Sequence, residues 1–172
     1  MYNNRSPDKN FRGNSNTMPP SPPRVRIESF YTEGTKDVKR ELFDTTAEKI
    51  TSGFVVIGKG RDDKAYGYGV GRTQLRRLYN EVKRFEQKLD GTEGTWNKHC
   101  PYIKMIKSKA CYNIVRASKD SSKKEVYKKL SDFITEGIDL IKDEGDYHVF
   151  TALFEAVYGF YYDKSKDFER GN

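Results

Sequence analysis

The segment best suited to phosphate chemistry runs from Tyr66 to Arg77, where three glycines precede three arginines. A P-loop has the pattern G-x-x-x-x-G-K-[ST], because its backbone amides wrap a phosphate that its lysine also contacts. Gly71-Arg72-Thr73 matches the end of this pattern, but Arg72 replaces the lysine and Tyr66 occupies the place of the first glycine. No βαβ pattern follows, as a dinucleotide site would require. The segment therefore disfavours a nucleotide-dependent enzyme.

The chain offers few groups for acid–base, nucleophilic or metal chemistry. Its only histidines are His99 and His148, and its only cysteines are Cys100 and Cys111. None of them has a partner at a spacing typical of a catalytic site or a zinc site. A di-iron centre would need two Glu-x-x-His motifs, and the sequence has none. We therefore expect a protein without catalytic residues, metal or cofactor, in which both thiols are free.

Basic residues give a stronger indication. The formal net charge is +7, but residues 125–172 hold 11 acids and 6 bases, which leaves +12 on residues 1–124. Between Gly94 and Lys119 there are six Lys or Arg residues and no acid. A solvated helix face usually mixes both signs of charge, so this run favours an anionic partner.

Two predicted helices carry many of these bases on their surfaces. On one helix, Arg72 and Arg76 lie one turn apart, and on the next, Lys109, Tyr112 and Arg116 share a face. Two basic faces with an interleaved tyrosine suit a phosphate backbone and a stacked base. The candidate RNA-binding residues are Arg72, Arg76, Arg77, Lys104, Lys107, Lys109, Tyr112 and Arg116.

These residues also have structural interpretations. Tyr112 could belong to the core, and Arg116 could pair with a carboxylate such as Glu155. Two functions of different classes therefore stay open. One is an RNA-binding protein, and the other is a helical protein-interaction scaffold whose basic face meets an acidic partner without RNA contact. A small enzyme that uses the Gly-rich segment is the least favoured hypothesis.

Amphipathic helices are the elements that must position these residues. Apolar residues recur at spacings of three and four over about residues 46–52, 73–90, 101–117, 121–144 and 146–161. We expect Thr45 or Thr46, Thr73 and Asp146 to cap three of these helices. A loop through Trp96 would precede the helix that opens at Pro101. Five such helices with short connections predict an all-α fold, a compact antiparallel bundle.

The remaining segments predict loops and a tail. Residues 58–71 contain five glycines and follow a short apolar run at 54–57, so we expect a Gly-rich loop after the first helix. Residues 1–28 hold five of the six prolines and predict a disordered tail, which leaves 29–172 as one helical domain. No apolar run of 18 residues or signal peptide occurs. We therefore expect a cytoplasmic protein that does not contact a membrane.

Three segments are similar to a known family, the Csm-type small subunit of the type III-A CRISPR effector complex. RTQLRRLY at 72–79 resembles the family's basic helix start, and KSKACYNIVR at 107–116 resembles its basic helix with a Tyr four residues before an Arg. FEAVYGFY at 154–161 resembles its C-terminal Phe-x-Glu-Ala helix, and TAEKI at 46–50 resembles its first helix. The order and spacing also fit, and the resemblance covers about residues 40–164.

The resemblance implies a non-catalytic role in antiviral defence. Several copies would stack along the effector filament, beside the backbone subunits that hold the guide RNA. Their basic faces would hold target RNA, with little base specificity, and cleavage would belong to other subunits. The expected partners are guide RNA, target RNA, the backbone and large subunits, and other copies of this chain. Arg72, Arg76 and Arg77 match the family's basic helix start, and Lys107, Lys109 and Arg116 match its basic third helix.

Overall fold

The computed structural model describes residues 23–59, 65–89, 95–117 and 121–166. The fold is mostly helical, as predicted. In chain order, a π-helical turn η1 (Leu42–Thr46) leads into α1 (Ala47–Ser52), β1 (Val55–Lys59) and β2 (Ala65–Gly69). The helices α2 (Arg72–Leu89), α3 (Thr95–Lys104), α4 (Ile106–Ala117), α5 (Ser121–Leu140) and α6 (Glu144–Lys164) follow. No described helix is both long and apolar enough to cross a membrane.

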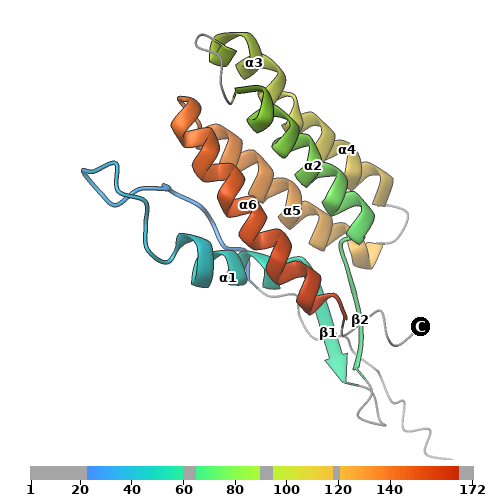
Figure 1. The fold of residues 1–172 in the computed structure, drawn as a ribbon. Helices are drawn as coiled ribbons and strands as arrows, with labels where there is room; N and C mark the ends of the chain where they lie inside the picture. The colour runs from blue at the N-terminus through green and yellow to red at the C-terminus, as the bar shows by residue number, and fades with distance from the viewer. Residues whose placement is uncertain (1–22, 60–64, 90–94, 118–120, 167–172) are drawn as a thin grey trace, which may run out of the picture.

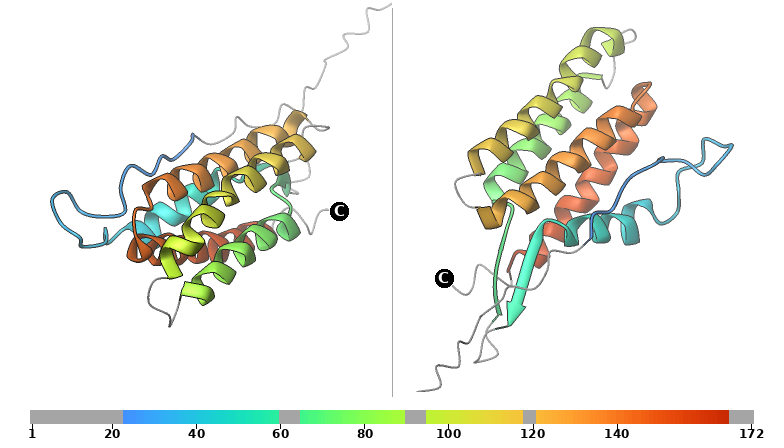
Figure 2. Two further views of the ribbon diagram at one scale, coloured as in Figure 1. Left: turned by 90° about the horizontal axis from the view of Figure 1, so that it is seen from above. Right: turned by 180° about the vertical axis from the view of Figure 1, so that it is seen from behind.

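Four long helices form the body of the molecule. Helix α2 packs against α4 and α6, and α5 packs against the same two helices. Each runs antiparallel to the neighbours on which it packs, while α1 lies across α6 at one end and the β1–β2 hairpin extends beyond the bundle (Figures 1 and 2). The predicted antiparallel bundle is therefore confirmed.

The core is rich in aromatic rings from α5 and α6. The Phe133 ring lies 5.3 Å from the Phe154 ring and 5.8 Å from the Phe150 ring, and all three side chains are buried. Burying each of them contributes about 1.5–3 kcal/mol. Gly137 lets α5 approach α6, since a Cβ there would lie 2.1 Å from Cε2 of Phe150.

The third predicted helix begins earlier than expected. Helix α3 starts at Thr95, so Trp96 is helical rather than in a loop, and Pro101 lies inside the helix. The Trp96 ring lies 6.4 Å from the Tyr147 ring of α6, which gives this first turn a packing surface. A turn at Met105 then separates α3 from α4. The one predicted helix is therefore two helices. The earlier start of α3 shows tertiary packing outweighing the local preference of proline for a first turn.

The expected caps are wrong. Thr46 has helical backbone angles and makes no capping bond, and Thr73 lies inside α2, which begins at Arg72. The cap of α6 is Asp143, whose carboxylate accepts the N–H of Asp146 at 2.8 Å. Helices α2 and α6 begin before the residues expected to cap them, Thr73 and Asp146, whereas α1 begins directly after Thr46.

Asp146 itself is a buried structural residue. Its carboxylate accepts the hydroxyl of Tyr31 at 2.7 Å and the N–H of Lys142 at 2.9 Å. Burial by itself would raise the pKa of Asp146, but these two bonds and nearby Lys36 lower it overall. In turn, burial and the Asp146 carboxylate raise the pKa of Tyr31 to about 12. The bonds fix the segment around Tyr31 to the start of α6.

Part of the predicted Gly-rich loop is a strand. Residues 65–69 form β2, which pairs antiparallel with β1 so that Val55 faces Gly69 and Ile57 faces Gly67. Two neighbours of this hairpin, Phe54 and Val70, are buried. The glycines weaken the strand signal in the sequence, but pairing with β1 supplies their hydrogen bonds. Residues 60–64 lie outside the described residues.

The N-terminal tail prediction falls mainly on residues 1–22, which lie outside the described residues. Residues 23–28 pack on α5. Ile27 is buried and its N–H donates to the Glu136 carboxylate at 3.2 Å, while Arg24 pairs with Asp132 at 3.4 Å and also with Glu136. The end of the predicted tail thus belongs to the folded body.

Candidate nucleic-acid interface

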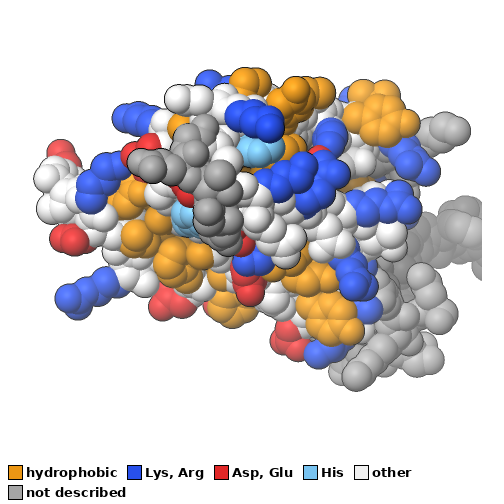
Figure 3. Space-filling model, turned by 45° about the horizontal axis from the view of Figure 1, so that its top comes forward, with side chains coloured by type: hydrophobic (Ala, Val, Ile, Leu, Met, Phe, Trp, Pro, Cys, Tyr) orange, Lys and Arg blue, Asp and Glu red, His pale blue; other side chains and the backbone are white. Residues whose placement is uncertain are grey.

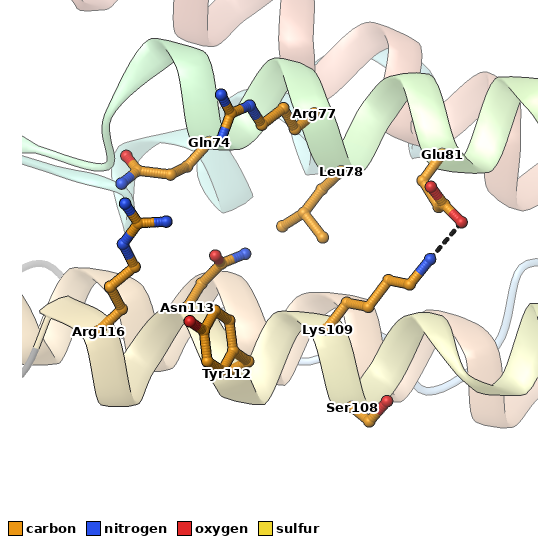
Figure 4. Close-up of a pocket in the computed structure, with 9 residues that line it drawn as sticks. All are labelled: Gln74, Arg77, Leu78, Glu81, Ser108, Lys109, Tyr112, Asn113 and Arg116. Atoms are coloured by element: carbon orange, nitrogen blue, oxygen red, sulfur yellow. Dashed lines mark hydrogen bonds and ion pairs between the residues drawn. The ribbon is translucent and has the colours of Figure 1, made fainter.

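A groove of about 350 Å³ runs between α2 and α4 (Figure 4). Leu78 of α2 is buried and forms part of its floor. From α2, the walls carry Gln74, Arg77 and Glu81; from α4, they carry Ser108, Lys109, Tyr112, Asn113 and Arg116. The groove therefore combines apolar, amide, aromatic and guanidinium groups.

Hydrophobic spacing sets which residues reach the groove. The buried face of α2 contains Leu75, Leu78, Val82, Phe85 and Leu89. Successive residues of a helix turn by about 100°. Residues at positions 74, 77 and 81 consequently share one flank of this face, the flank beside α4. On α4, burial of Ile106 and Ala110 turns positions 109, 113 and 116 toward α2 in the same way.

Two arginines are the free charges of the groove. Arg77 and Arg116 make no hydrogen bond or ion pair with the described part of the chain. In contrast, Lys109 pairs with Glu81, which also accepts from Arg84 at 2.6 Å. The acid of the groove is thus neutralised by its own lysine and by Arg84, while two guanidinium groups are left for a ligand.

Tyr112 and Arg116 do not have the structural roles considered for them. Tyr112 is 64% exposed, so it is not a core residue. Glu155 is the partner of Lys83, with the two charged atoms 3.1 Å apart, and not of Arg116. Both residues therefore remain available at the groove.

Arg72 and Arg76 lie on the other flank of α2, toward α6. With Thr73 and three tyrosines of α6, they line a separate cavity of about 240 Å³. Arg72 donates to the hydroxyl of Ser165 at 2.7 Å, and its guanidinium lies 5.0 Å from the centre of the Tyr162 ring. Arg76 is exposed and forms no ion pair within the described residues. The predicted single basic face is thus divided between two flanks, because Arg72 and Arg77 differ by more than a third of a turn around the helix.

The remaining predicted bases are divided as well. Lys107 pairs with Asp139 of α5, so it ties two helices of the bundle together. Lys104 is exposed at the end of α3, and no described residue is its ion-pair partner. Lys83 lies outside the groove, where its hydrogen bond to Glu86 raises its pKa despite some burial. Lysines that look alike in the sequence therefore have different surroundings.

Charge is also uneven over the surface. On the face shown in Figure 3, most Lys and Arg side chains gather on the right-hand half, among exposed hydrophobic side chains, and most Asp and Glu side chains lie toward the left and lower edges. Within the described ranges, no group of three or more His, Cys, Asp or Glu side chains could hold a metal. Cys100 and Cys111 are free thiols.

Among the groove residues that were not predicted from the sequence are two amides, Gln74 and Asn113. Gln74 stands three residues before Arg77, and Asn113 stands three residues before Arg116, so each amide shares a helix face with a free arginine. That spacing was a usable signal. Neutral amides carry no charge, however, and a search for basic residues passes over them.

Comparison with known protein families identifies a relationship over most of the chain. The model of the protein family described as Csm2 Type III-A matches residues 61–166, a stretch that contains all of α2 to α6 and hence the whole groove. No curated protein and no solved structure matches the chain.

Proposed function

Because the chain belongs to the type III-A Csm2 family, the small subunits of the Csm CRISPR effector complex, we propose that it binds RNA in the groove between α2 and α4. Members of this family are generally structural, non-catalytic components of the complex. The observation that carries the proposal is the pair of arginines, Arg77 and Arg116, which flank exposed Tyr112 and bind no acid of the described chain.

The chemistry of the groove suits a nucleic-acid strand. A guanidinium group donates to phosphate oxygens in a planar, often bidentate geometry. An exposed tyrosine ring offers a stacking surface that any base can use. Such contacts read the backbone and shape of RNA rather than its sequence. In this proposal, Arg77, Lys109, Tyr112 and Arg116 contact the strand directly.

The other predicted bases have secondary roles in the proposal. Arg76 and Lys104 are exposed outside the groove, Arg76 on the α6 flank of α2 and Lys104 at the end of α3, and they add positive charge to the surface around it. Arg72 and Lys107 mainly stabilise the bundle. Arg72 already donates to Ser165, directly after α6, and Lys107 already pairs with Asp139 of α5. The strand held would be target RNA paired to the guide RNA of the complex.

We also propose that several copies stack along the guide RNA filament, beside the backbone and large subunits. The support is the charge asymmetry of the chain, +12 over residues 1–124 and −5 over residues 125–172. The acidic C-terminal part of one copy would then meet the basic part of the next. Such contacts weaken as salt rises, so self-association that is equal at 50 mM and 500 mM salt contradicts this arrangement.

The RNA-binding proposal is tested by the double variant Arg77→Ala/Arg116→Ala. A single-stranded RNA is titrated at several salt concentrations, and the slope of log K against log salt is measured. Loss of two phosphate contacts should reduce the magnitude of this slope by about 1.4. The matched control is Arg26→Ala/Arg40→Ala, which removes the same charge from exposed positions before α1. Equal slopes and affinities for both double variants would refute the proposal.

A further inference from the structure

A buried tyrosine connects α5 to the start of α2. Tyr127 is 5% exposed, and its hydroxyl oxygen accepts the N–H of Gly71 at 2.9 Å. The same hydroxyl donates to Oε1 of Gln74 at 2.7 Å. Gln74 is thus held by a residue from another helix, although it also lines the groove between α2 and α4.

This arrangement fixes which end of the Gln74 amide faces the groove. The hydroxyl oxygen of Tyr127 already accepts the Gly71 N–H, so its own proton needs an acceptor. Oε1 of Gln74 is that acceptor. If the Gln74 amide were turned around, its Nε2 group and the Gly71 N–H would both point at the Tyr127 hydroxyl oxygen. The hydroxyl proton would then have no acceptor in a partly buried place, which is costly. The Nε2 group of Gln74 is therefore the end turned away from Tyr127.

Gly71 leaves the space that this amide occupies. A Cβ at residue 71 would lie 2.0 Å from Oε1 of Gln74 and 3.2 Å from the Tyr127 hydroxyl. Among the described glycines, Gly34 is the one with a positive φ, so backbone conformation does not explain Gly71. The glycine is needed because any side chain would displace the Gln74 amide from its bond to Tyr127.

The amide faces a second donor across the groove. The ends of the Gln74 and Arg116 side chains point toward one another (Figure 4). Both the Nε2 group and the guanidinium are N–H donors, and neither donates to a described residue. Glu81, the carboxylate of the groove, is already engaged by Lys109 and Arg84. The space between the two donors therefore suits an acceptor oxygen from a ligand.

We propose that Gln74 and Arg116 together hold one acceptor oxygen of the bound strand, and that Tyr127 and Gly71 position Gln74 for this bond. The inference rests on the proposed binding of RNA in the groove and adds Gln74 as a specificity residue. The oxygen is either a phosphate oxygen or a ribose 2′-hydroxyl. These two sources give different outcomes with DNA, since only RNA has the 2′-hydroxyl.

The test uses the full chain with the variant Gln74→Leu, which keeps the size of the side chain and removes its donor. Loss of one hydrogen bond should weaken RNA binding about 3- to 10-fold. The salt slope should not change, because glutamine is neutral and releases no counterion. DNA of the same sequence identifies the source: an unchanged DNA affinity indicates the 2′-hydroxyl, and an equal loss for both strands indicates a phosphate oxygen.

Tyr127 is tested as a positioning residue through Tyr127→Phe. This variant should also weaken RNA binding, and the double variant Gln74→Leu/Tyr127→Phe should bind no more weakly than Gln74→Leu alone, because Tyr127 acts through Gln74. A purely structural role would lower stability and give additive losses instead. Wild-type affinity of Gln74→Leu for both strands, or additive losses, overturns this inference. If Arg77→Ala/Arg116→Ala still weakens binding, the proposed function survives that result.

Discussion

Two helical glycines provide a matched pair of substitutions that should have opposite effects on stability. At Gly137 of α5, a Cβ would lie 2.1 Å from Cε2 of Phe150, a ring that is fully buried against Phe133 and Phe154. At Gly159 of α6, which is exposed, a Cβ would meet no atom within 4 Å. Alanine therefore creates a clash at the first position and none at the second.

The magnitudes follow from these surroundings. Overpacking a closed core costs about 1–3 kcal/mol, and replacing a helical glycine by alanine stabilises by about 0.5–1 kcal/mol. Because the Phe150 ring has no free space, the upper value of the overpacking cost, about 3 kcal/mol, applies at Gly137. The helical gain of about 0.5–1 kcal/mol offsets part of it, so Gly137→Ala should lower the free energy of unfolding by about 2 kcal/mol. Gly159→Ala should raise it by about 0.5–1 kcal/mol.

Urea unfolding followed by circular dichroism measures both values. In a domain of this size, the melting temperature should fall by about 4–8 °C for Gly137→Ala and rise by about 1–4 °C for Gly159→Ala. Wild-type m-values would show that the unfolded state is unaffected. Stabilisation by Gly137→Ala would refute the close contact of α5 with α6 that the packing argument requires.

Three further substitutions test other parts of the account. The pKa of Asp146 is lower in the folded protein than its ordinary value of 3.8. The ionised carboxylate therefore stabilises the fold at pH values above 3.8, and this stabilisation is lost as the pH falls through the folded pKa. Asp146→Asn should flatten the fall in stability below about pH 4, as seen in melting curves across pH. Tyr147→Phe removes the bond from the buried hydroxyl to the Val82 carbonyl at 2.7 Å and should cost about 0.5–1.5 kcal/mol in denaturant titrations. Lys107→Ala breaks a half-exposed pair with Asp139 and should change stability by less than about 1 kcal/mol while RNA affinity stays within twofold in a binding titration.

Long amphipathic patterns made the bundle predictable from sequence. The spacing of Leu75, Leu78, Val82 and Phe85 identified α2 and its buried face, and the same reasoning found α4, α5 and α6. These helices bury one face each, so local sequence and tertiary structure agree. The acid-free run at 95–118 also includes α4, whose Lys109 and Arg116 line the groove.

Features that depend on distant contacts were less predictable. The first turn of α3 packs on Tyr147, a residue far away in the sequence. The β1–β2 hairpin and the cap of α6 are local features, but glycines mask the strand β2, and the cap Asp143 stands three residues before the acid that was expected to cap. The candidate groove shows the same limit. Arg72 and Arg77 are indistinguishable by type, yet one contacts Ser165 and Tyr162 and the other faces α4. Gln74 shares a helix face with Arg77, but its bond to Tyr127 of α5 depends on the tertiary structure.

Cross-linking within the assembled effector complex can show whether target RNA contacts the groove between α2 and α4. Target RNA that carries 4-thiouridine is bound to the complex, irradiated, and digested with trypsin and nuclease before mass spectrometry. We expect RNA adducts on the tryptic peptide of residues 110–116, which contains exposed Tyr112 at the groove between α2 and α4. Adducts confined to other surfaces of this subunit, with that peptide unmodified at every position of the label, would contradict the assignment of the groove as the RNA-binding site.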